Sequence, residues 1–538
     1  MAGISQGKPR VRRQAGRARI AANAGKSRTI AYEGGDTRGD VLRQWHASMG
    51  RSADAEISWS RDQINARARD LARNNGWASG AVTKEVDAVI GATFRPLLKP
   101  DWHALGLSEE WARKWRKDVQ SLWRAYADDP RCYSDSTRQQ SMSQLMATAY
   151  RHGILEGDAI GILQWKQERP NATCLRIVSP ELLCNPQDTA DRVDLRSGIE
   201  IDRDGAAIAY HFRQGHRGDP WADLNQFAWK RIARETEWGR PIVIHWFDKK
   251  GDGQSRGVSH FAPIIEKLKM EDRLGKAELE ATLLNSIMAA FIKSPFDPAL
   301  LADAINPDGG DQIGAYQDLR QEYAKSHPIT LGGAQITRLM AGEELEFATA
   351  QRPSSGYAAF EEAVLRHISS GLGISYEQLA SDWSKVNYSS ARAALIEIWR
   401  GWNGRRQSFA QRFAQPVLMA AIEEWVDDGR LSLPNGAPDF RENWFAYTRA
   451  KWVGPGKGFV DPVKEVQAAA MRIALGLSTM EDEAAELTGS DLSDNLAQIT
   501  QEIGQLPAGM LHPAQESFAK LIGHNGGPPI EEGRPRQD

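Results

Sequence analysis

Apolar residues recur at steps of three and four along several stretches of the chain, which is the spacing of one buried helix face. After Ser108, a predicted N-cap followed by two glutamates, this face comprises Trp111, Trp115, Val119, Leu122 and Tyr126. Further helices are expected at residues 61–74, 78–90, 139–152, 360–372, 388–426 (broken near Gly401 and Gly404 and kinked at Pro416) and 462–475.

The longest helical signal covers residues 259–293, with Ser259 as its cap and Pro263 in its first turn. Such a helix would be a rod of about 50 Å. Its first half is charged and includes Lys267, Lys269, Arg273 and Lys276. Its second half carries one apolar stripe, formed by Leu279, Leu283, Ile287 and Phe291. A rod of this kind projects from a globular body or packs against copies of itself.

Alternating patterns predict strands in the region between these helices. A strand is expected at 158–165, a hairpin at 199–212 with its turn at Arg203-Asp204-Gly205, and a short strand at 242–247. Residues 170–247 therefore form a predicted β-rich insertion, and the fold class is α+β.

Composition narrows the class of protein. The chain of 538 residues has a net charge of −3 and a mean hydropathy of −0.51, which argues against a wholly basic nucleic-acid binder. Its three cysteines cannot form a disulfide framework or a thiolate zinc site, and no apolar run is long enough for a membrane span. Eighteen tryptophans suggest broad packed surfaces. The basic first segment and the Pro/Gly-rich last segment are expected to be disordered.

The search for catalytic motifs finds none that is complete. Gly25-Lys26-Ser27 lacks the first glycine and the strand of a phosphate-binding loop, and Gly371-Leu372-Gly373 lacks the third glycine of a dinucleotide motif. Asp202 and Asp204 fit a hairpin turn better than a calcium loop, and His211 and His245 are expected to be structural. We therefore expect no enzyme, no cofactor and no metal.

Short motifs follow one another in order between residues 60 and 475. They are Arg67-Ala68-Arg69-Asp70-Leu71-Ala72-Arg73-Asn74-Asn75 with Val89-Ile90-Gly91; Glu156-Gly157-Asp158-Ala159; Ile244-His245-Trp246-Phe247 with Gln254-Ser255-Arg256-Gly257-Val258-Ser259; Gly371-Leu372-Gly373-Ile374-Ser375-Tyr376-Glu377 with Asp382 and Asn387-Tyr388-Ser389-Ser390-Ala391-Arg392; and Val460-Asp461-Pro462-Val463-Lys464-Glu465. In this order and spacing the chain resembles the lambda-type family of tailed-bacteriophage portal proteins.

The resemblance implies a homo-oligomeric ring, usually a dodecamer, at one capsid vertex of the virion. Such a ring is the channel for double-stranded DNA during packaging and viral DNA ejection, and it is the head–tail connector. The implied partners are dsDNA bound non-specifically, the large terminase subunit, the major capsid protein and a head–tail adaptor, with no membrane. Assembly would take place in the host cytoplasm.

Family architecture also suggests a division of the chain into wing, stem, clip and crown. The expected regions are a basic arm at 1–40, the N-terminal part of the wing at 41–169, a β-rich clip-like region at 170–258, a stem helix at 259–294, the C-terminal part of the wing at 295–452, a crown-like helical region at 453–504 and a flexible tail at 505–538.

Candidate functional residues follow from this division. The DNA-channel or stem candidates are Lys267, Lys269, Arg273 and Lys276, with a solvated helix face as the equal alternative. The stem-packing candidates are Leu279, Leu283, Ile287 and Phe291. The tunnel-loop candidates, within residues 381–390, are Asp382, Trp383, Lys385 and Asn387, and helix capping is favoured over DNA contact for Asn387.

Two other classes of protein remain as alternatives. One is a DNA-processing enzyme, either a nuclease or the motor ATPase, which the incomplete nucleotide and metal motifs disfavour. The other is a monomeric scaffold or minor capsid protein.

Overall fold

The structure is a computed structural model, and it describes most of the chain between residues 50 and 507. The described residues are 44, 45, 50–220, 224–286, 290–293, 318, 321, 322, 326, 328–331, 334–337, 344–347, 356–457, 461–507 and 512. Residues 1–52 and 53–538 form separate units, and the fold described here is that of the second. The predicted basic arm and most of the predicted C-terminal tail lie outside the described residues.

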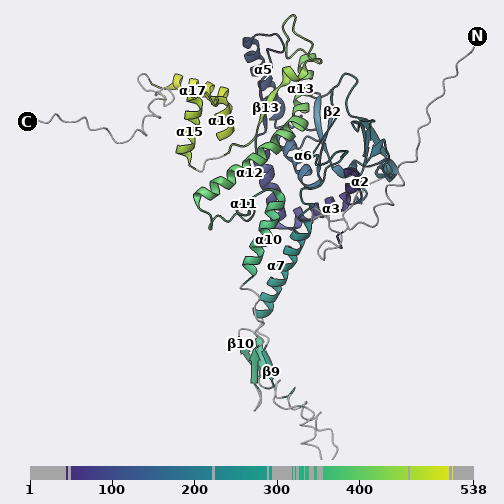
Figure 1. Cartoon of the computed structure of the whole chain (residues 1–538), viewed down its shortest axis with the longest axis vertical. Helices are drawn as coiled ribbons and strands as arrows, with labels where there is room; N and C mark the ends of the chain where they lie inside the picture. The colour runs from purple at the N-terminus through teal and green to yellow at the C-terminus, as the bar shows by residue number, and fades with distance from the viewer. Residues whose placement is uncertain are drawn as a thin grey trace, which may run out of the picture. The chain divides into compact units, whose positions relative to one another are not determined.

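Helices make up most of the regular structure in the described part of the second unit (Figure 1). The α-helices are α2 (Ala53–Ile57), α3 (Arg61–Asn74), α4 (Gly76–Val89), α5 (Glu109–Ala127), α6 (Met142–Glu156), α7 (Ile265–Ser286), α10 (Tyr357–Leu372), α11 (Tyr376–Ala380), α12 (Tyr388–Phe409), α13 (Gln415–Asp427), α14 (Trp444–Thr448), α15 (Pro462–Ala474), α16 (Met480–Leu487) and α17 (Leu492–Gln505). Shorter helical turns are the 3-10 helices η2 (Pro180–Leu182), η3 (Pro186–Asp188) and η4 (Leu224–Phe227) and the π-helix η5 (Ala410–Ala414).

The strands form small antiparallel sheets. They are β1 (Arg95–Leu98), β2 (Asp158–Trp165), β3 (Thr173–Val178), β4 (Leu195–Arg196), β5 (Ile199–Ile201), β6 (Ala207–Arg213), β7 (Trp229–Ala233), β8 (Val243–Phe247), β9 (Ala290–Lys293), β10 (Pro328–Leu331), β11 (Ala334–Thr337), β12 (Glu344–Phe347) and β13 (Ala450–Val453).

The central sheet has the order β3-β2-β8, so β2 is paired on both sides, with Gly161 opposite Ile177 and Ile244. A four-stranded sheet follows the order β4-β5-β6-β7, and the separate pairs are β1–β13, β10–β11 and β9–β12. The predicted α+β class is confirmed, and so are the hairpin and the strand at 158–165.

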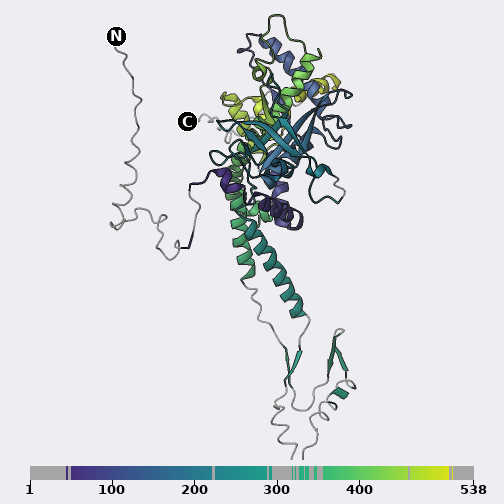
Figure 2. The same ribbon diagram turned by 90° about the vertical axis from the view of Figure 1, so that its right-hand side faces the viewer.

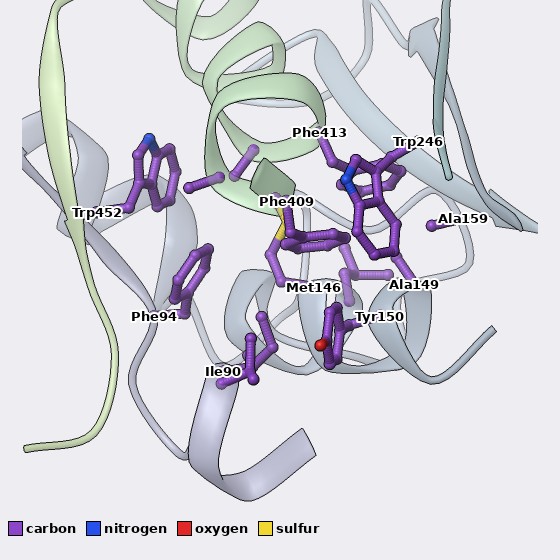
Figure 3. Packing of buried hydrophobic residues seen from close by; sticks show 14 of the residues in the cluster. Ile90, Phe94, Met146, Ala149, Tyr150, Ala159, Trp246, Phe409, Phe413 and Trp452 are labelled. Atoms are coloured by element: carbon purple, nitrogen blue, oxygen red, sulfur yellow. The ribbon is translucent and has the colours of Figure 1, made fainter. Parts of the chain in front are cut away.

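One hydrophobic core joins the central sheet to the surrounding helices. Phe409 occupies its middle, and its ring centroid lies 5.3 Å from those of Tyr150 and Trp246 and 4.9 Å from that of Phe413 (Figure 3). The predicted apolar face after Ser108 faces this core, with Trp115 and Val119 fully buried. Many tryptophans are thus core residues.

Two predicted helices differ from the observed ones. The stretch 388–426 is not broken at its glycines; α12 runs through them and the irregularity is the π-helix η5 that precedes Pro416. The stretch 259–293 is shorter as a helix, since α7 begins at Ile265, ends at Ser286 and is followed by strand β9. Strand β9 pairs with β12, a partner about fifty residues further along the chain that local periodicity does not reveal.

Candidate functional site

Helices α7 and α10 leave the core side by side, as Figures 1 and 2 both show. At the core end, Ile264 and Leu268 are buried together with Leu365 and Ile368 of α10. The backbone of α10 lies directly against the side chain of Ile264, because a Cβ atom added to Gly371 would lie 2.4 Å from Cγ2 of Ile264. Further along, the indole of Trp77 in α4 donates a hydrogen bond of 3.3 Å to Glu271. These contacts fix the direction in which the helix pair leaves the core.

Two of the stem-packing candidates beyond this point have largely exposed side chains. Leu279 is 61% exposed and Leu283 is 54% exposed. Ile287 lies outside the described residues, and Phe291 belongs to strand β9 rather than to the helix. Of the predicted four-residue helical stripe, Leu279 and Leu283 do lie on α7. The prediction is wrong for Phe291, because the chain forms a strand at that position.

The four basic candidates of α7 are all exposed, but they do not form one surface. At 3.6 residues per turn, Lys269, Arg273 and Lys276 lie within an arc of about 60°, whereas Lys267 lies on the opposite side. Asp272 accepts hydrogen bonds from Lys276 (3.1 Å) and Lys269 (3.3 Å), and the bond from Lys276 is the main reason that the pKa of Asp272 is lowered. The side of α7 that carries Lys269, Arg273 and Lys276 therefore contains both basic residues and an acid, Asp272, that pairs with two of them.

The candidate loop lies between α11 and α12. Asn387 is the N-cap of α12, since its Oδ1 accepts a 2.9 Å hydrogen bond from the backbone N–H of Ser390, and this confirms the predicted capping role. Asp382 accepts from the backbone N–H of Ser384 (3.0 Å). Trp383 is 40% exposed, and Lys385 forms a 3.0 Å ion pair with Glu362 of α10. One basic residue of the loop is thus tied to the helix pair.

The base of this loop is fixed by a residue that the sequence did not suggest. Nζ of Lys84, in α4, donates to the carbonyl oxygens of Gln378 and Leu379 (3.2 Å to the latter) and to Oγ of Ser381 (2.7 Å). A cation at the C-terminus of α11 stabilises the carbonyls that have no partner within the helix. Burial lowers the pKa of Lys84. No local signal links Lys84 to a loop almost three hundred residues away.

Two of the sequence motifs meet at the start of the segment that leads into α7. Arg256, 2% exposed, donates from Nε to Oδ2 of Asp158 (2.8 Å), and the backbone N–H of Gly257 donates to Oδ1 of the same residue (2.7 Å). His245 also contacts this carboxylate, with an Nε2–Oδ1 distance of 2.9 Å, and Nη1 of Arg61 lies 3.5 Å from Oδ2. The pKa of Asp158 is lowered, chiefly by Arg256 and His245, against the opposing effect of burial. The cluster is structural, and it holds the end of β2 against the chain entering α7.

Comparison with known proteins identifies the family of the chain. The family model described as "Phage portal protein, lambda family" matches residues 38–406. The portal protein of Escherichia phage N15 is 35% identical over 490 residues, which cover 90% of this chain and 91% of that protein. Portal protein B of Escherichia phage lambda is 34% identical with the same coverage.

These matches define a phage portal protein. The chain belongs to the lambda family of phage portal proteins. Among solved structures, a chain from the neck of an empty gene transfer agent particle is 14% identical, with a TM-score of 0.42 and coverage of 81% of this chain and 94% of that one. No helix in the described part of the chain combines the length and apolar character that a membrane-spanning segment requires.

Proposed function

We propose that copies of this chain assemble into a ring, with α7 and α10 of each copy forming the stem, and that double-stranded DNA passes through the ring during packaging and exit. The observation that carries this proposal is the α7–α10 pair, because it leaves the core with Leu279 exposed at the end far from its buried base. An apolar residue in this position is covered when neighbouring copies stand side by side.

The charge pattern of the stem suits a surface along which DNA moves. Lys269 and Lys276 share Asp272, and Arg273 lies beside them on the same face. Unpaired lysines and arginines that neutralise DNA phosphates release counterions, and the protein then binds DNA strongly. Lysines that are already paired with carboxylates bind DNA only weakly, and this binding depends on the salt concentration. We assign these three residues, with Lys267 on the opposite side of α7, to the surfaces that face the DNA or the neighbouring stem.

The 381–387 loop is our candidate for the part that approaches DNA most closely. Its base is held by Lys84, and its Lys385 is held by Glu362 at 3.0 Å. The exposed indole of Trp383 offers a flat surface, and Asp382 and Asn387 hold the backbone of the loop through their bonds to Ser384 and Ser390. Loss of the Lys385–Glu362 pair would leave the ammonium group available to a phosphate.

The clip-like region has two candidates. The sequence pointed to residues 170–258, and that assignment stays a prediction; strands β3 and β8 from this region flank β2 in the core, with Leu175 and Ile244 buried. Residues 290–347 are the second candidate. The antiparallel pair β9–β12 follows α7 and precedes α10 in the chain, so this segment joins the two stem helices. We favour the second candidate because it joins the ends of α7 and α10 that lie far from the buried Ile264 and Leu268.

The remaining regions and partners follow from family membership. We propose that α15–α17 belong to the crown, that the ring sits at a portal vertex of the virion, and that the large terminase subunit, the major capsid protein and a head–tail adaptor bind to it. The chain would act as a structural conduit and not as an enzyme. An assay of ATP hydrolysis and nuclease activity on the purified protein tests the last statement, since turnover lost on changing one carboxylate would contradict it.

The ring itself is tested by electron microscopy and light scattering of the purified full chain. We expect closed rings with a central opening wide enough for a DNA duplex. A monodisperse particle of 59.7 kDa at high concentration, with no rings in micrographs, would overturn the proposal and favour a monomeric scaffold. On the rings, replacing Lys269, Arg273 and Lys276 together by Gln should reduce the slope of duplex binding against salt without loss of assembly.

A further inference from the structure

The C-terminal helical unit, residues 461–507 with α15, α16 and α17, is attached to the rest of the chain mainly through charged side chains. Arg116 of α5 pairs with Glu481 (3.0 Å), Arg124 of α5 pairs with Asp494 (2.5 Å), and Lys451 of β13 pairs with Asp482 (2.6 Å). The apolar part of this contact is small, since its buried cluster consists of Leu97, Val453 and Ala485.

The apolar side chains of the same unit are exposed instead. The exposed large apolar residues are Val463 (66%), Val466 (47%), Met471 (56%), Leu475 (74%), Leu477 (74%), Met480 (52%) and Leu496 (51%). Among the described residues of the unit, the buried apolar ones are Ala469 and Ala485, and α17 buries none of its residues. Short helices with so little core of their own depend on packing against another surface.

The apolar residues of α15 gather on one side. Arg472 turns inward and donates to both carboxylate oxygens of Glu483 in α16 (2.8 and 2.6 Å), and Ala469 is buried on the same side. At about 100° per residue, Val463, Val466 and Met471 project from the remaining half of the helix. We call these residues, with Leu475, the α15 face.

Helix α17 carries a second, narrower apolar stripe. Leu492, Leu496, Ile499 and Ile503 recur at steps of four, three and four, within an arc of about 60°. Asp494, which pairs with Arg124 of α5, lies on the opposite side of the helix. The stripe therefore faces away from α5; Leu496 is 51% exposed, whereas Leu492, Ile499 and Ile503 are partly buried within the chain. We call it the α17 stripe.

The charges beside these two surfaces differ in sign. At about 100° per residue, Glu502 lies beside the α17 stripe, and α17 contains no Lys or Arg, whereas Lys464 lies between Met471 and Leu475 on the α15 face. Two copies of α17 placed together would bring like charges together, but α15 against α17 brings opposite charges together. One subunit thus carries two different apolar surfaces of complementary charge, as a head-to-tail contact requires.

We propose that the α15 face of one copy binds the α17 stripe of a second copy of this chain. The proposal rests on the proposed ring, in which every subunit presents the same unit at the same height to its neighbours. A head-to-tail contact repeated around a common axis gives a closed ring when the rotation between neighbouring copies is a whole-number fraction of 360°. The C-terminal unit would then complete its core between subunits and not within one.

Disulfide trapping tests this contact in the full chain. The variant carries Val466→Cys and Leu496→Cys, with Cys132→Ser and Cys184→Ser to remove the other partly exposed thiols. Under mild oxidation we expect a ladder of covalent dimers, trimers and larger species. Each single-cysteine variant should give no ladder. A matched control variant carries Val193→Cys and Leu496→Cys. Val193 is 87% exposed and lies outside the C-terminal helical unit, so this variant should also give no ladder.

Other outcomes would overturn the proposal in distinguishable ways. Covalent dimers from Val466→Cys alone would mean an α15–α15 contact. A disulfide within one chain would mean that the two surfaces meet inside the subunit. Intact rings without a ladder would reject this contact and leave the ring proposal standing, whereas absence of rings from the unmodified protein rejects the ring itself. If removal of residues 508–538 raised hydrogen exchange in α15 of the monomer, the α15 face would be covered by the C-terminal segment of the same chain and not by a second copy.

A substitution gives a second readout. Val466→Glu should leave the folding of the monomer unchanged because the side chain is already about half exposed, and it should reduce the yield of rings at least tenfold. Ile208→Glu, at a 48% exposed position in β6, is the matched control and should assemble normally. Normal ring yield from Val466→Glu would contradict the proposal.

Discussion

Nε of Arg256 lies 2.8 Å from Oδ2 of Asp158, and both side chains are almost completely buried. The other guanidinium nitrogens of Arg256 donate to the carbonyl oxygens of Leu183 and Ser197 (2.8 Å each) and of Pro180 (3.0 Å). One side chain thereby joins β2, the loops around the four-stranded sheet and the segment that leads into α7. The direction of the stem depends on this cluster.

Replacing Arg256 by Met should therefore destabilise the subunit strongly. The substitution keeps the aliphatic part of the side chain but leaves Asp158 buried without its main counter-charge, which typically costs about 3–5 kcal/mol. Chemical denaturation followed by tryptophan fluorescence measures this loss. The control is Arg231→Met, because Arg231 forms a comparable pair with Glu200 (2.7 Å) but is 52% exposed, so about 1 kcal/mol or less is expected. Equal losses for the two variants would contradict the importance given to burial.

Gly257→Ala should disturb the same junction by a steric route. A Cβ atom at Gly257 would lie 1.9 Å from the carbonyl oxygen of Gly157, a backbone atom that cannot move without shifting the end of α6. We expect a loss of about 3 kcal/mol or more in the free energy of unfolding. Gly80→Ala is the control: nothing lies within 4 Å of its added Cβ in α4, and alanine should stabilise the helix by up to about 1 kcal/mol. A stable Gly257→Ala variant would show that the two backbones are not in close contact.

The attachment of the C-terminal helical unit should weaken in acid. The hydrogen bond from Lys451 lowers the pKa of Asp482 to about 2, from a model-peptide value near 4. A carboxyl whose pKa is lowered by folding contributes stability above its unfolded pKa, and this stability is lost as the pH falls through the folded value. Between about pH 4 and pH 2, hydrogen exchange in α16 should therefore rise.

The Asp482→Asn variant is the control for this pH effect. It should show faster exchange in α16 already at pH 6 and a smaller further change on acidification. If the unmodified chain and the Asn variant responded to acid in the same way, other carboxylates of the unit would be responsible. Asp494 would be the next to examine, since its pair with Arg124 is close to the same surface.

Local sequence patterns predicted those elements whose structure is decided by near neighbours. The strand Asp158–Trp165 and the helix Arg61–Asn74 have the predicted bounds, because alternation and caps are local signals. Asn387 was predicted as a cap for the same reason. The end of α7 was missed, since strand β9 exists by pairing with β12 far along the chain.

The candidate site was predicted only in part, for a related reason. Exposed charges such as Lys269 and Lys276 can be placed on a helix from spacing alone, and their partner Asp272 lies within the same two turns. The pairing of Lys84 with the 381–387 loop and that of Arg256 with Asp158 join residues that are remote in sequence. Both motifs around Asp158 and Arg256 were visible, but nothing local showed that they meet.

The stem offers a comparison between folding and assembly on a single helix. Leu268 and Leu279 are both on α7, but Leu268 is fully buried against the core whereas Leu279 is 61% exposed. Leu268→Asp should prevent stable folding, because a carboxylate would be buried in the core without a partner. Leu279→Asp should fold normally, with unchanged circular dichroism and an unchanged unfolding midpoint, since its side chain remains in water in the monomer.

The two variants should therefore fail at different steps. Leu279→Asp should remain a folded monomer or small oligomer under conditions in which the unmodified chain forms rings, because the ring would bring the new carboxylate into an apolar contact between neighbouring stems. Light scattering and negative-stain microscopy distinguish these states. If Leu279→Asp gave rings in normal yield, the leucine would not be part of the stem contact. If it failed to fold, Leu279 would stabilise the subunit itself, and the stem would pack within one chain more closely than the exposed fraction of this side chain indicates.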